Sequence, residues 1–121
     1  MARKYKAMNP EIKAQWLEAL RSGKYRQARY MLTEKKQKKF HYCCLGVLCA
    51  IDPLAERQRP EPNSSFYSFV DELGQRSDAS LPRNVGQRAG LTMPVQEKLA
   101  GMNDDEGMSF RQIADWIEEN L

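Results

Sequence analysis

The middle of the chain carries one segment with no charged side chain and almost no polarity beyond three thiols. It is the run YCCLGVLCAI at residues 42–51. A segment that is apolar on every side must be buried on every side. Cysteine, leucine and alanine outweigh β-branched residues in it, and Asp52-Pro53 follows directly. The pattern therefore predicts a buried helix over residues 43–51, around which the rest of the domain packs.

Both outer parts of the chain predict amphipathic helices with strong start signals. Asn9 fits an N-cap that is followed by proline at the first helical position, and Gly23 fits the residue after the C-terminus. Ser109 and Gln112 have the spacing of a capping box. Apolar positions recur with helical spacing behind each start, at Ile12, Trp16, Ala19 and Leu20 and at Phe110, Ile113, Ala114, Ile117 and Leu121.

The remaining segments predict a small sheet and short helices. Aromatic segments on both sides of the polar run 33–39 predict a β-hairpin with a lysine-rich tip, and residues 66–70 read as a strand that residues 73–80 turn back. Three prolines predict a loop for residues 53–65. Short helical segments are expected at 81–89 and 93–99, followed by an acidic loop at 101–107.

These elements together predict an α+β fold in a single domain at residues 9–121, preceded by a basic, loosely ordered arm at residues 1–8. We expect the two terminal amphipathic helices and a small antiparallel sheet to surround the central buried helix. A chain of 121 residues is long enough to build such a core without disulfides or a structural metal.

Charge is distributed unevenly along the chain, although the net charge is only +3. Residues 1–60 hold 14 Lys/Arg and 5 Asp/Glu (+9), and residues 61–121 hold 5 and 11 (−6). The basic part fits a nucleic-acid or acidic protein partner, or attraction between the halves of one fold. The candidate binding residues are Lys35, Lys36, Lys38, Lys39, Arg57 and Arg59. Tyr25, Tyr30 and Phe40 are candidates for base stacking. A solvated hairpin tip that protects a sheet edge is the alternative.

The thiols are the candidates for metal or nucleophilic chemistry, together with His41. Zinc takes four nitrogen or sulfur ligands, but Cys43, Cys44 and Cys49 lie on one apolar element with no second ligand pair elsewhere. A catalytic thiol needs a base oriented by a third group, and the single histidine lies only two residues before Cys43. Free cysteine is a common core residue. We therefore expect interior packing, with no catalytic residue, metal or cofactor.

Four segments together resemble a group of small proteins encoded by bacteriophages and prophages. They are WLEALRSGKYRQ (16–27), YCCLGVLC (42–49), LPRNVGQRAGL (81–91) and LAGMNDDEGMSFRQIADWIEENL (99–121). The chain departs from that group's pattern at residues 33–39 and 53–80, where functions specific to this chain are expected.

The resemblance implies a protein of the host bacterial cytoplasm that binds a host protein or ribonucleoprotein complex and no membrane. The expected function is inhibition of an antiviral defence component, as anti-CRISPR proteins do, without catalysis. Two alternatives stay open. One is a nucleic-acid-binding module that uses the basic hairpin tip, and the other is a sponge for a signalling nucleotide.

Overall fold

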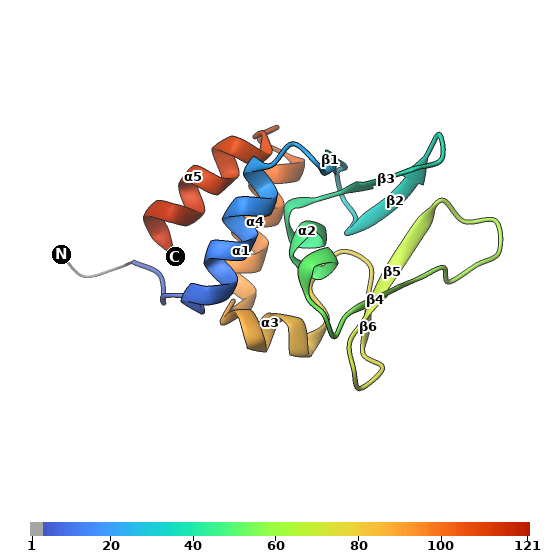
Figure 1. The fold of residues 1–121 in the computed structure, drawn as a ribbon, viewed down its shortest axis with the longest axis horizontal. Coiled ribbons are helices and arrows are strands. Elements are labelled where there is room, and N and C mark those ends of the chain that lie inside the picture. The colour runs from blue at the N-terminus through green and yellow to red at the C-terminus, as the bar shows by residue number, and fades with distance from the viewer. Residues whose placement is uncertain (1–3) are drawn as a thin grey trace.

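The computed structural model describes residues 4–121, in which a helical half and a sheet half meet at one central helix (Figure 1). The helices of these residues are α1 (Pro10–Arg21), α2 (Cys44–Ile51), α3 (Arg83–Ala89), α4 (Met93–Asp104) and α5 (Phe110–Asn120). The strands are β1 (Arg26–Gln27), β2 (Thr33–Lys36), β3 (Lys39–Tyr42), β4 (Glu56–Gln58), β5 (Phe66–Val70) and β6 (Arg76–Ser77). The predicted α+β class is confirmed.

The strands form one mixed sheet with the order β1-β3-β2-β5-β4, and β6 pairs with β5. The pairs are antiparallel, as expected, except that the two residues of β1 run parallel to β3. The β2–β3 hairpin and the connection from β4 to β5 extend away from the helices (Figure 1). Their outer parts are therefore free of helical cover.

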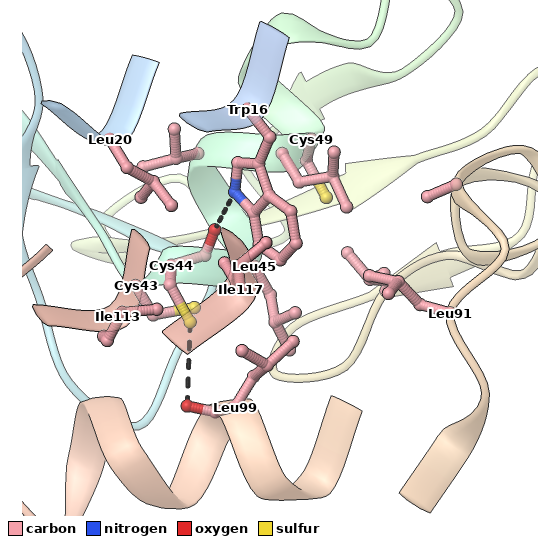
Figure 2. Close-up of a cluster of buried hydrophobic side chains, with 14 of the residues drawn as sticks. Trp16, Leu20, Cys43, Cys44, Leu45, Cys49, Leu91, Leu99, Ile113 and Ile117 are labelled. Atoms are coloured by element: carbon pink, nitrogen blue, oxygen red, sulfur yellow. Dashed lines mark hydrogen bonds between the residues drawn. The ribbon is translucent and has the colours of Figure 1, made fainter. Parts of the chain in front are cut away.

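Helix α2 is the buried centre that the apolar run predicted. Residues 44–49 are all buried, and α1, α4 and α5 pack around them (Figure 2). The indole Nε1 of the fully buried Trp16 donates a hydrogen bond to the Cys44 carbonyl oxygen at 3.0 Å. This bond links α1 to the first turn of α2. It gives the buried indole N–H and the carbonyl oxygen a hydrogen-bond partner without water.

The terminal helices begin where their caps predicted. Asn9 accepts hydrogen bonds from the backbone N–H groups of Glu11 and Ile12, and Ser109 with Gln112 makes the capping box in both directions. The two helices lie against each other, and Arg21 of α1 contacts Asp115 of α5 at 2.8 Å. The predicted boundaries are confirmed at both starts.

The predicted N-terminal arm is described only from residue 4, so its first three residues lie outside the described part. The Met8 N–H donates to the Leu121 carbonyl oxygen at 3.1 Å, and the Met8 side chain is buried. The Tyr5 ring meets Trp116 edge to face, with 5.3 Å between the ring centroids. Residues 5 and 8 therefore contact the C-terminal helix.

Three segments differ from the sequence-based expectation. The turn of the hairpin is only Gln37-Lys38, both at positive φ, because β2 extends through Lys36 and β3 begins at Lys39. Strand β4 lies inside the predicted loop 53–65; it is an edge strand with every residue exposed, so it carries no apolar alternation. Helix α4 continues to Asp104, and the expected acidic loop is thus mostly helical.

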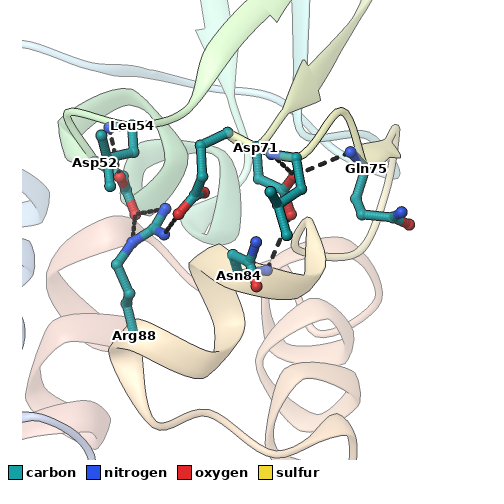
Figure 3. Close-up of polar contacts among 8 residues, drawn as sticks. Asp52, Leu54, Asp71, Gln75, Asn84 and Arg88 are labelled. Carbon is teal, nitrogen blue, oxygen red and sulfur yellow. Dashed lines mark hydrogen bonds and ion pairs between the residues drawn. The ribbon is translucent and has the colours of Figure 1, made fainter.

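Polar contacts connect the sheet half to α3 (Figure 3). Arg88 of α3 bonds to Asp52 at 2.9 Å, just after α2, and to Glu72, just after β5. Asp71 accepts from the N–H groups of Leu73, Gln75 and Asn84. Burial raises the pKa of Asp71, but these three backbone donors outweigh it, so the pKa lies below its usual value. The end of β5 is therefore firmly attached to the helical half.

Candidate functional site

The three thiols are interior side chains, as the sequence predicted. Cys43, Cys44 and Cys49 are buried, and burial raises the pKa of each, to about 12 for Cys43. The Cys43 sulfur caps α2 by accepting from the Gly46 N–H, and the Cys44 thiol donates to the Leu99 carbonyl oxygen (Figure 2). No group of three or more His, Cys, Asp or Glu side chains in residues 4–121 is arranged to hold a metal ion.

We expect the thiols of the folded protein to resist Ellman's reagent at pH 8. A pKa near 12 leaves roughly one thiol in ten thousand ionised at that pH, and the thiolate is the reactive form. The native protein should react far more slowly than free cysteine, whereas protein in concentrated urea should release three equivalents at once. Fast reaction of one native thiol would show an accessible sulfur and contradict the packing role.

A separate group of side chains covers the outer part of the sheet, and we call it the cationic sheet face. It consists of Lys35, Phe40, Tyr42, Arg57, Arg59 and Tyr67. The register pairs Lys35 with Phe40 and aligns Thr33 with both Tyr42 and Tyr67. Paired residues of neighbouring strands point to the same side, so strands distant in sequence contribute to one surface.

Arg57 is fixed on an aromatic ring rather than on a carboxylate. Its guanidinium carbon lies 3.4 Å from the centroid of the Phe40 ring, and Nη1 donates to the Tyr42 hydroxyl oxygen at 2.7 Å. The Lys35 Nζ lies 5.5 Å from the same centroid. Cation–π contact and one hydrogen bond to a neutral hydroxyl oxygen orient the guanidinium without cancelling its charge.

Arg59 is held in a similar way by Tyr67. Its Nε donates to the Tyr67 hydroxyl oxygen at 3.0 Å, Nη2 donates to the same oxygen, and Nη1 donates to the Pro62 carbonyl oxygen at 2.8 Å. The Tyr67 ring in turn meets Phe40 edge to face at 5.0 Å. The two arginines and two rings therefore form one connected cluster.

The cations of this surface have no carboxylate partner within the described part of the chain, in contrast to Arg21 and Arg88 of the helical half. In the helical half, Arg21 pairs with Asp115 and Glu118, and Arg88 pairs with Asp52 and Glu72. Five cations in the sheet half have no carboxylate within 4.0 Å among residues 4–121: Lys35, Lys38, Lys39, Arg57 and Arg59. All five are exposed. Their charge is available to a partner.

The structure separates one predicted site residue from the others. Lys36 forms an ion pair with Glu34 at 3.1 Å, and strand alternation places it on the side of the sheet opposite Lys35. Lys38 lies in the hairpin turn, and Lys39 at the start of β3 pairs with Lys36 and therefore lies on that opposite side, at the edge of the cationic sheet face. Tyr30, a predicted stacking residue, instead binds Asp104 through its N–H and Asp105 through its hydroxyl group.

Sequence reasoning did not find the two tyrosines that hold the arginines. Tyr42 begins the apolar run, which pointed to burial, and Tyr67 lies in a strand whose exposed side was undetermined. The alternation of residues 66–70 could have placed Tyr67 and Phe69 on one side. Only the pairing of β2 with β5 brings Tyr67 beside Phe40.

Fold and site define a small α+β domain with an unneutralised, aromatic-supported cationic surface on its sheet. The chain belongs to the family described as a domain of unknown function (DUF8296), whose model matches residues 8–121. No curated protein and no solved structure matches the chain. Among the helices of residues 4–121, none has both the length and the apolar character needed to cross a membrane. The phage origin suggested by the resemblance stays a prediction.

Proposed function

We propose that this protein is a non-catalytic binding module whose cationic sheet face takes single-stranded nucleic acid. One observation carries the proposal: the sheet half holds exposed cations without a carboxylate partner among the described residues, and two of them, Arg57 and Arg59, are arginines held on aromatic rings. The buried thiols with raised pKa values support a function without a sulfur nucleophile.

The geometry favours phosphate as the group that is bound. A guanidinium is a planar fork of N–H donors that matches two phosphate oxygens. Arg57 uses only Nη1 in hydrogen bonds within residues 4–121, so its other donors are available. Because the ring contacts already restrict both side chains, less rotamer entropy is lost when a phosphate binds.

Single strands suit this surface better than duplexes because their bases are free to pack on exposed aromatic rings. Unstacked bases pack on aromatic rings and on arginine guanidinium planes. Phe40 and Tyr67 are partly exposed, and Arg57 and Arg59 are exposed. Lys38 and Lys39, at the end of the hairpin, add long-range attraction to the backbone. Binding is therefore expected to depend on salt more than on sequence.

We expect R57Q/R59Q to weaken binding of a fluorescent single-stranded 12-mer in anisotropy titrations. Each lost phosphate contact should reduce the slope of log K against log salt by about 0.7, hence about 1.4 for the pair. R57K/R59K retains the charge but loses the planar fork, so its affinity should fall with an unchanged slope. The control K98Q/R111Q removes two exposed cations of the helical half and should leave both quantities unchanged.

Equal effects of R57Q/R59Q and K98Q/R111Q would contradict the assignment, provided that thermal unfolding shows all variants folded. The expected inhibitor of a host antiviral factor also stays a prediction. Carboxylates of an acidic protein groove accept the same bidentate bonds from arginine. Suppose the wild type binds no single strand. Suppose also that, after nuclease treatment, the wild type retains a host protein and R57Q/R59Q does not. The partner would then be protein and not nucleic acid.

A further inference from the structure

A pocket of about 550 Å³ opens to solvent beside β1, next to the cationic sheet face. Its lining combines three cations, three aromatic rings and one glycine: Lys24, Arg26, Lys39, Tyr25, Phe40, Tyr42 and Gly23. No acidic residue lines it. None of the three cations has a carboxylate within 4.0 Å among the described residues. The pocket is therefore positively charged and aromatic.

The chain path explains how these residues meet. Helix α1 ends before Gly23, whose φ of +77° turns the chain in a way that side-chain-bearing residues rarely adopt. The next residues form β1, which pairs in parallel with β3, so that Arg26 aligns with His41. The Tyr25 ring stands edge-on against Tyr42, with 5.4 Å between centroids and 79° between planes. Segments 23–26 and 39–42 thus lie side by side and line one pocket.

Size and lining match one kind of small ligand. Ligand pockets in proteins measure about 300–1,000 Å³ and join apolar walls to a few placed polar groups. Three exposed cations can surround a phosphate, and the partly exposed Tyr25 ring offers a surface for a base. Phe40 and Tyr42 also hold Arg57 and Lys35, so the pocket is continuous with the cationic sheet face.

We propose that this pocket binds one nucleotide, with its phosphate among Lys24, Arg26 and Lys39 and its base against Tyr25. The inference rests on the proposed function in so far as that nucleotide belongs to a strand on the cationic sheet face. A free mononucleotide has the same chemistry and is the other source of the ligand. The experiment therefore tests both a single strand and a free mononucleotide.

The test is an NMR titration of the full ¹⁵N-labelled chain with adenosine 5′-monophosphate, with ribose 5-phosphate and with the 12-mer. Adenosine 5′-monophosphate should shift the amides of residues 23–27 and 39–42 saturably. Ribose 5-phosphate should bind at least about fivefold more weakly, because it lacks the stacking base. Tyr25→Leu should remove that difference, and Arg26→Gln should weaken both ligands. The controls Tyr30→Leu and Arg111→Gln should change neither.

Each outcome decides between the two proposals. If the strand and the mononucleotide both shift the pocket, the bound nucleotide is part of the strand. If the strand shifts only the amides around Arg57 and neither ligand reaches the pocket, the pocket assignment is wrong and the proposed function stands. If the mononucleotide fills the pocket while the strand binds nowhere, the proposed function is wrong and the ligand is a free nucleotide. Equal binding of the two small ligands would overturn the base site.

Discussion

Gly46→Ala is expected to leave most of the protein unfolded. A Cβ atom built at Gly46 would lie 1.8 Å from the Leu32 carbonyl oxygen and 2.7 Å from its carbon, both backbone atoms. The same oxygen accepts the Cys43 N–H at 3.2 Å, so the contact lies where α2 begins against the start of the sheet. Helix and strand would have to separate, which we expect to cost more than about 3 kcal/mol.

Helix propensity alone predicts that Gly46→Ala stabilises the protein. Alanine is favoured over glycine in a helix interior by about 1 kcal/mol. Gly101→Ala in α4 is therefore the matched control, because no atom beyond its chain neighbours and its own helix backbone lies within 4 Å of the added Cβ. Urea unfolding followed by circular dichroism should show Gly101→Ala at least as stable as the wild type. A Gly46→Ala protein of wild-type stability would mean that α2 does not rest on Leu32.

Local signals were sufficient to predict the helices that carry them. Asn9 and Ser109 mark the two terminal starts because capping is an interaction between residues close in sequence. The apolar run predicts α2 since burial on all sides leaves no room for polar residues. The sequence also predicted that helices end before Gly23 and Gly90, because glycine is typical of the left-handed residue just after a helix, and both have positive φ.

Tertiary contacts decided the elements that the sequence did not predict. Strand β4 exists because its backbone pairs with β5, not because its exposed side chains favour a strand. Helix α4 continues through Asn103, whose side chain is hydrogen-bonded by partners from two other segments, Gln27-Ala28 and Cys44. Neither cause leaves a periodic pattern in the sequence.

The candidate surface was predicted only in part for the same reason. The lysines and arginines were recognisable as basic residues, and Lys35, Arg57 and Arg59 do lie together. Which of them have a carboxylate partner depends on the tertiary structure, in which Lys36 forms an ion pair with Glu34, two residues earlier in β2, and Lys35 on the other side of the strand has none among the described residues. The aromatic supports come from β3 and β5, which are separated by the whole of α2 and β4, so no local pattern brings Phe40 and Tyr67 together.

Asn103→Ala is expected to destabilise the fold by several kcal/mol. The Asn103 side chain is fully buried, and its oxygen accepts from the Cys44 N–H at 3.2 Å and from Gln27 Nε2 at 2.8 Å. Its nitrogen donates to the Ala28 carbonyl oxygen at 2.8 Å. Alanine would leave a donor at the start of α2 and an acceptor after β1 buried without partners, at about 1–3 kcal/mol each.

The control for this change is Asn120→Ala, which removes a single bond to the Trp116 carbonyl oxygen at the partly exposed end of α5. It should shift the free energy of unfolding by no more than about 1 kcal/mol in the same urea experiment. Asn103 also fixes Gln27, the neighbour of Arg26 in the pocket. A folded Asn103→Ala protein should therefore bind adenosine 5′-monophosphate more weakly than the Asn120→Ala protein does. Equal stability and equal binding of the two variants would contradict the role of Asn103 as the link between α4, α2 and β1.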